Sequence, residues 1–201
     1  MSLIYNNTHT PKEDRDLWRT PKPLFDTLNK EFCFNVDVAA DENNNLCNQY
    51  FTEDDNALLA TWGKSNWCNP PYSKVKPWVR WARVQHEAGK TIVMLVNAET
   101  SSTWFKEAFD SCNEVRFISG RIAFINNSTG KPQGGNSKGQ VLFIWRAHCK
   151  SHCVSLIDRE DLYRTQKNPP RITGKSHRKT NTGIIARTNG ITRRIGFKYG
   201  I

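Results

Sequence analysis

The amino-acid sequence predicts an α/β fold, with helices packed against a largely parallel sheet. Two observations support this class. Strand-like and helical segments alternate along residues 22–145, which is the order that builds a parallel sheet with crossover helices. Residues 91–96 form an uninterrupted apolar run, which is typical of a strand buried on both faces. We expect an antiparallel hairpin to finish the sheet.

The first predicted helix covers residues 22–32, where apolar residues recur at helical spacing. Thr20 is its expected N-cap, and Pro21 suits the first turn because a proline there loses no hydrogen bond. Residues 34–40 follow as a short strand. The later elements are a loop at 41–49, a helical turn around 57–59, a strand at 66–68, a helix at 77–89, a strand at 91–96, a helix from Ser101 or Ser102 to Phe109, strands at 114–118 and 121–125, a loop at 126–139, a strand at 140–145 and a short helix at 157–163.

The net charge of +10 is concentrated at the C-terminus. After Asp161 the chain has ten Lys and Arg residues and no acidic residue. The 201 residues suffice for one domain and a tail, so we predict a polar lead-in at 1–16, a domain at 17–163 and a flexible basic tail at 164–201. Such a tail favours a polyanionic partner, of which nucleic acid is the common one.

The sequence also predicts the compartment. It has no run of about 18 apolar residues, so no membrane span is expected. Its six cysteines lack a CxxC pair, and the cluster at residues 148–153 fits no common zinc spacing, so neither a disulfide framework nor a metal is indicated. A reducing cytoplasm, bacterial or that of a phage host, is the expected location.

Asn69-Pro70-Pro71-Tyr72 is the most informative segment. Two adjacent prolines stiffen the turn and remove two backbone donors, so its carbonyls are available as acceptors. An amide stands before the turn and an aromatic ring after it, which together suit a planar ring that bears an amino group. The alternative is a rigid surface turn that follows a strand.

Two other predicted strand ends carry polar groups. Asp37 precedes Val38, Ala39 and Ala40, whose small side chains would let a ligand approach closely. The segment 53–56 offers further acceptors for ribose hydroxyls or an adenosyl amino group. Ligands of open α/β sheets bind at such carboxyl ends. Asp37 could instead cap a helix, and residues 53–56 could form a solvated loop.

Over roughly residues 17–145, the chain resembles the small phage-type DNA N6-adenine methyltransferases of the phage Dam family. The matching residues are Trp18-Arg19-Thr20-Pro21 with Leu24-Phe25, Asp37-Val38-Ala39-Ala40, Cys47 with Tyr50-Phe51-Thr52, Asp54-Asp55-Asn56-Ala57-Leu58, Trp62, Asn69-Pro70-Pro71-Tyr72-Ser73, Trp78, Ala82, Thr103-Trp104-Phe105 and Gly120-Arg121-Ile122 with Phe124.

The resemblance implies S-adenosylmethionine as methyl donor and double-stranded DNA as substrate. It also implies a Rossmann-like methyltransferase sheet with an antiparallel C-terminal strand, in three α/β/α layers. The donor would contact Trp18, Thr20, Pro21, Asp37, Ala39, Ala40, Asp54 and Asp55. The chain departs from many nucleic-acid methyltransferases at Ala39 and Ala40, where those enzymes carry a glycine-rich loop.

The implied reaction is attack of adenine N6 on the donor methyl group. The Asn69 side-chain oxygen and the Pro70 carbonyl would accept the two amino hydrogens, and Tyr72 would stack on the extruded base. Ser73, Arg121, Lys131 and Lys138 are the expected DNA contacts within the domain. Arg121 could equally pair with an internal carboxylate, and residues 126–140 could form a plain flexible hairpin.

Other activities fit the same turn. Methyltransferases that act on RNA adenines or on glutamine amides of proteins use it, and a non-catalytic DNA-binding module would keep it as a structural turn. Cytosine-N4 methylation is a nearer alternative, although a serine in place of Asn69 would favour it. The sequence leaves the DNA recognition site and the oligomeric state open.

Overall fold

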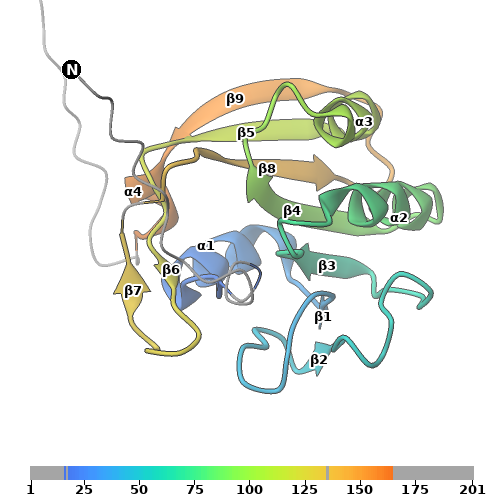
Figure 1. Cartoon of the computed structure of the whole chain (residues 1–201). Helices are drawn as coiled ribbons and strands as arrows, with labels where there is room; N and C mark the ends of the chain where they lie inside the picture. The colour runs from blue at the N-terminus through green and yellow to red at the C-terminus, as the bar shows by residue number, and fades with distance from the viewer. Residues whose placement is uncertain (1–15, 17, 135, 165–201) are drawn as a thin grey trace, which may run out of the picture. The chain divides into compact units, whose positions relative to one another are not determined.

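The computed structural model describes residues 16, 18–134 and 136–164, which form an α/β fold around a central sheet (Figure 1). The strands are β1 (Val36–Asp37), β2 (Gln49–Tyr50), β3 (Ser65–Cys68), β4 (Thr91–Asn97), β5 (Glu114–Ser119), β6 (Phe124–Ile125), β7 (Pro132–Gln133), β8 (Gln140–Trp145) and β9 (Cys153–Asp158). The helices are α1 (Lys22–Phe32), α2 (Val75–Glu87), α3 (Thr103–Ser111) and α4 (Arg159–Leu162).

Seven strands form the central sheet in the order β2-β1-β3-β4-β8-β5-β9. β8 lies antiparallel between β4 and β5, and the other neighbours pair in parallel. The predicted α/β class and the antiparallel late strand are therefore confirmed. β6 and β7 form a separate antiparallel pair.

Helices cover both faces of the sheet, as the sequence predicted for a three-layer fold. Successive side chains of a strand point to opposite faces. In β4, Ile92 and Met94 accordingly pack in the core under α2 and α3, whereas Val93 and Leu95 pack in the core under α1 and α4. The central strand is thus buried on both faces, as its apolar run predicts.

Helix α1 has the predicted bounds but not the predicted cap. Pro21 occupies the N-cap position, and its carbonyl accepts hydrogen bonds from the backbone N–H groups of Leu24 and Phe25. The Thr20 hydroxyl is buried and has no hydrogen-bond partner among the described residues. The expectation that Thr20 caps the helix was therefore wrong, and its hydroxyl is left for another partner.

Two predicted strands are shorter than expected. Of residues 34–40, only Val36–Asp37 is strand, although the Val38 N–H still donates to the Trp67 carbonyl at 2.9 Å. Of residues 121–125, only Phe124–Ile125 is strand, and it pairs with β7 rather than with β5. β8 and β9 occupy the two edges of β5, so residues 121–125 cannot pair with β5 as a hairpin about Gly120.

The strongest departure from the prediction is β9. It includes the first two residues of the helix predicted at 157–163, so that only the single turn α4 is helical there. β9 pairs with β5 along its whole length, from Cys153 opposite Glu114 to Asp158 opposite Ser119. Most of its side chains are exposed, including the apolar Val154 and Leu156. Residues 53–59 form turns rather than a helical segment.

Helix α2 starts two residues earlier than predicted, and Gly89 follows its end with φ of 83°, a conformation that glycine adopts without strain.

Except for Asp16 and Arg164, the predicted lead-in and basic tail lie outside the described residues. Within the described ranges, none of the helices has the length and apolarity needed to cross a membrane.

Candidate active site

A cavity of about 480 Å³ lies at the carboxyl ends of β1 and β3. β1 ends at Asp37 and β3 at Cys68, directly before Asn69, and these neighbouring strands run in parallel. The fold thus brings together sequence-distant residues at one sheet edge. The predicted site residues that line the cavity are Trp18, Thr20, Asp37, Ala39, Ala40, Asn69 and Ser73.

The cavity lining differs from the predicted donor contacts in one loop. All four residues of the segment are exposed, but Glu53 and Asn56 line the cavity whereas Asp54 and Asp55 do not. Asp55 instead accepts hydrogen bonds at 2.8 Å from both the N–H and the hydroxyl of Thr52. The sequence identified the segment but not which of its residues line the cavity, because turns have no fixed side-chain period.

Asp37 is the buried acid of the cavity, with 3% of its surface exposed. Its carboxylate accepts hydrogen bonds from the N–H of Leu46 at 3.1 Å and from the N–H of Ala39 at 3.4 Å. Burial raises the pKa of Asp37 to about 7, because the loss of water outweighs these two hydrogen bonds. A cation bound beside it would be favoured, since it would restore the charged form.

The side-chain amide of Asn69 has its nitrogen hydrogen-bonded to the protein and its oxygen without a partner among the described residues. Its Nδ2 donates to the Trp18 carbonyl at 3.1 Å. Its Oδ1 is buried and accepts no hydrogen bond from the described residues. Buried polar atoms are rarely left unpaired, so an orphaned acceptor at a cavity wall is typical of a ligand-binding group.

Pro70, Pro21 and Tyr72 belong to the same region but do not line the cavity. The Tyr72 ring packs against both halves of the core and meets Phe124 edge-to-face, with ring centroids 6.2 Å apart. Its hydroxyl is buried and has no hydrogen-bond partner in the described ranges, and burial raises the pKa of the phenol far above its ordinary value. In this arrangement the Tyr72 ring supports the turn from the core side.

The predicted DNA contacts have different surroundings. The Ser73 N–H and hydroxyl both donate to the Asp16 carboxylate. Arg121 and Lys131 are exposed, and Lys138 forms an ion pair with Glu99. The Arg121 carbonyl accepts a hydrogen bond from Arg159 at 3.0 Å. None of the three basic residues lines the cavity.

Sequence reasoning missed two parts of the site. Asp16 was assigned to a lead-in, yet it lines the cavity and binds Ser73. The apolar wall was also not anticipated, and it is formed by Leu46, Phe51, Ala57, Leu58 and Trp78. Several of these residues belong to the motifs that carry the family resemblance, so their joint occurrence was the available signal.

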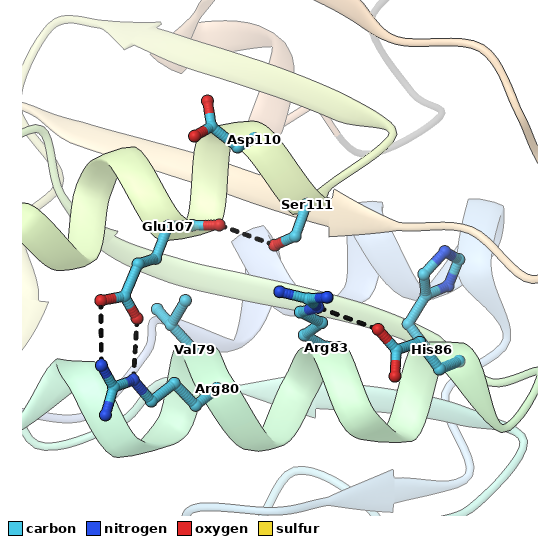
Figure 2. A pocket seen from close by; sticks show the side chains of 8 residues that line it. Val79, Arg80, Arg83, His86, Glu107, Asp110 and Ser111 are labelled. Atoms are coloured by element: carbon cyan, nitrogen blue, oxygen red, sulfur yellow. Dashed lines mark hydrogen bonds and ion pairs between the residues drawn. The ribbon is translucent and has the colours of Figure 1, made fainter.

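A second cavity, of about 610 Å³, lies between α2 and α3 (Figure 2). Two ion pairs lie within its lining: Arg80 Nε lies 2.9 Å from Glu107, and Arg83 Nε lies 2.9 Å from Glu87. It contains none of the predicted site residues. The strand-end cavity, which has an orphaned acceptor and a buried acid, is therefore the candidate active site.

In the part of the chain that the structure describes, no cluster of three or more His, Cys, Asp or Glu residues is placed to hold a metal ion. In the cysteine- and histidine-containing segment at 148–153, His152 Nδ1 lies 3.0 Å from the Cys112 carbonyl and its ring packs against Phe109.

Comparison with known proteins identifies the family of the chain. The family model "DNA N-6-adenine-methyltransferase (Dam)" matches residues 7–168. A DNA N-6-adenine-methyltransferase of Escherichia phage T1 is 38% identical over 160 residues, which is 71% of this chain and 67% of the relative. One of Haemophilus phage HP1 is 36% identical over 168 residues, 79% of this chain and 97% of the relative. The chain therefore belongs to the DNA N-6-adenine-methyltransferase (Dam) family.

Proposed function

We propose that this protein transfers a methyl group from S-adenosylmethionine to N6 of an adenine in double-stranded DNA. Membership of the Dam family supports adenine methylation of DNA. The observation that carries the proposed mechanism is the unpaired Asn69 Oδ1, which is buried at the wall of the strand-end cavity.

The cavity has the chemistry that a cationic, adenosine-bearing donor requires. Its volume of about 480 Å³ is within the range of small-molecule sites. Phe51 and Trp78 offer apolar surface for a purine, while Asp37 offers a buried negative charge for a cationic group. Thr20 adds a buried hydroxyl without a partner. When bound, the donor supplies an electrophilic methyl group on a sulfonium.

Ala39 and Ala40 stand where many related enzymes have glycines, and both line the cavity. The structure accommodates them without left-handed backbone, since neither residue is among the described non-glycine residues with positive φ. The Ala40 N–H is held by the Phe51 carbonyl at 3.0 Å. Alanine therefore suffices at both positions, because the loop needs small side chains rather than positive φ.

Asn69 has the role of activating the target nitrogen. The N6 lone pair of adenine is delocalised into the ring, so attack on a methyl group requires the nitrogen to become pyramidal. A hydrogen bond from N6 to Asn69 Oδ1 favours that geometry, and the Pro70 carbonyl, next in the chain, would accept the second amino hydrogen. Pro70 does not line the cavity, so this second contact requires the turn to shift when the base binds. Preorganised dipoles of this kind contribute about 3–4 kcal/mol to a transition state.

The target adenine must leave the duplex to reach this cavity. The described structure places Tyr72 against the core. Stacking of its ring on the base thus requires a shift of the turn that exposes the ring face. Arg121 and Lys131 are exposed and available for phosphate contacts, and the basic tail would add sequence-independent affinity.

The test is methylation of plasmid DNA with labelled S-adenosylmethionine, followed by nucleoside analysis and single-molecule sequencing. N6-methyladenine at defined positions supports the proposal, whereas N4-methylcytosine as the product, or methylation of RNA or protein in preference to DNA, contradicts it. Asn69→Ala should abolish methylation while donor affinity and DNA affinity persist. Wild-type rates in Asn69→Ala would show that the proposed mechanism is wrong.

A further inference from the structure

We infer that Asp16 is a positioning residue for methyl transfer, because it fastens the chain segment that orients the Asn69 amide. The inference rests on the proposed function and extends it to a residue that does not itself reach the target nitrogen. It stands on hydrogen bonds that join Asp16 and Trp18 to the two ends of the turn at residues 69–73.

The turn depends on hydrogen bonds from outside. Pro70 and Pro71 have no N–H and contribute no backbone donors. Among the described residues, the one backbone–backbone hydrogen bond within the turn runs from the Lys74 N–H to the Pro71 carbonyl, at 3.0 Å. The position of the Asn69 side chain is therefore set by the groups that bind the turn from neighbouring segments.

Asp16 and Trp18 each bind the turn at one end. At its start, Asn69 Nδ2 donates to the Trp18 carbonyl at 3.1 Å. At its end, the Asp16 carboxylate accepts from the Ser73 N–H at 2.9 Å and from the Ser73 hydroxyl. Hydrogen bonds to an ionised acceptor are about twice as strong as neutral ones, so Asp16 is the firmer of the two attachments.

The bond to Trp18 also decides which way the amide faces. A rotation that exchanged Nδ2 and Oδ1 of Asn69 would place two oxygen acceptors against each other at this contact, which is repulsive. The carbonyl of Trp18 therefore holds Nδ2 towards the protein and leaves Oδ1 as the unpaired acceptor. If Trp18 moved, the amide would lose this constraint.

Arg19 fixes the other side of Trp18. Its backbone exchanges two hydrogen bonds of 3.0 Å with Ile125 in β6. Its guanidinium donates to the Asn127 side chain, with Nε at 2.7 Å, and to the Asn43 carbonyl at 3.1 Å. Trp18 is thus held between an anchor on β6 and an anchor on the turn, and Asp16 supplies the latter.

The experiment compares Asp16→Ala with the wild-type protein under saturating donor and DNA. Loss of the anchor lets Asn69 move, and displacements of about 1 Å in a reacting group cost about 10²-fold in rate. We expect kcat to fall on the order of 10–100-fold, with donor Kd and the KM for DNA changed much less than kcat. Asp26→Ala is the control, because Asp26 is also an acid bound to a neighbour, Lys22, but lies on α1 outside the cavity.

A second pair of variants covers the case in which Asp16→Ala does not fold. Ser73→Ala removes one of the two donors to Asp16 and should lower kcat less than Asp16→Ala, whereas Ser73→Thr keeps the hydroxyl and should restore it. If Asp16→Ala or Ser73→Ala retains the wild-type kcat, or if donor affinity falls as much as kcat, the inference is overturned. A wild-type protein that makes no N6-methyladenine would instead refute the proposed function.

Discussion

The ionisation of Asp37 is expected to make donor binding depend on pH. Its carboxyl is 3% exposed, lines the cavity and has a pKa raised to about 7 by burial. S-adenosylmethionine carries a positive sulfonium, which favours the ionised carboxylate in the bound state. Binding should therefore release a proton when it takes place below the pKa of Asp37.

The magnitude follows from that pKa. At pH 6 about one tenth of the donor-free protein carries the Asp37 carboxylate, and at pH 8 about nine tenths do. If only the ionised form binds well, the donor affinity should rise about tenfold between these two pH values. The Asp37→Asn protein should bind the donor weakly and without this tenfold rise.

Titration calorimetry at pH 6, 7 and 8, in two buffers of different ionisation enthalpy, measures both the affinity and the protons released. Asp37→Asn measured with the same donor accounts for titration of the donor itself. A wild-type affinity that stays constant from pH 6 to pH 8, or an equal rise in Asp37→Asn, would refute the assigned role of Asp37.

The same pKa has a consequence for the donor-free protein. The folded state binds more protons than the unfolded state between the ordinary pKa of 3.8 and the raised value of about 7. The free energy of unfolding should consequently fall as pH rises through this window, by up to about 4 kcal/mol from this group. Asp37→Asn should flatten that fall in urea titrations, and an unchanged slope would contradict it.

Three further predictions concern other parts of the chain. Tyr72→Phe should keep or raise the thermal stability, because it removes a buried hydroxyl without a partner, and Tyr72→Ala should lower both stability and turnover; a marked loss of stability in Tyr72→Phe would contradict the core position of this ring. Arg116→Met should cost about 2–3 kcal/mol at pH 7, because Arg116 binds Glu31 at 2.7 Å and Glu114 at 2.6 Å, and urea titrations should show a smaller cost at pH 3.5. The sign follows because hydrogen bonds from Arg116 lower the pKa of Glu31, so the stabilisation is present above its ordinary pKa and is lost as pH falls; an equal cost at both pH values would contradict it. Deletion of residues 165–201 should reduce the salt dependence of DNA affinity, because it removes most of the C-terminal positive charge, and an unchanged slope in fluorescence anisotropy titrations would refute a DNA-binding tail.

The sequence predicted best the elements whose own apolar residues indicate which of their faces are buried. α1 and β8 have the predicted bounds, and β4 differs by one residue, because apolar periodicity reports burial directly. β9 shows the opposite case. Its side chains are largely exposed, Val154 and Leu156 among them, and it is a strand because it pairs with an edge of β5, a partner that its own residues do not identify.

The same division holds for the candidate site. The sequence by itself determined the family, the stiff Asn69-Pro70-Pro71-Tyr72 turn and the acid at the end of the first strand, because fixed φ angles and residue chemistry are local properties. Only the tertiary structure decided that Asn69 Oδ1 is unpaired, that burial shifts the pKa of Asp37, and that Asp16 holds the turn through Ser73. These depend on which groups meet across the fold, since desolvation and hydrogen bonding act between segments that are distant in sequence.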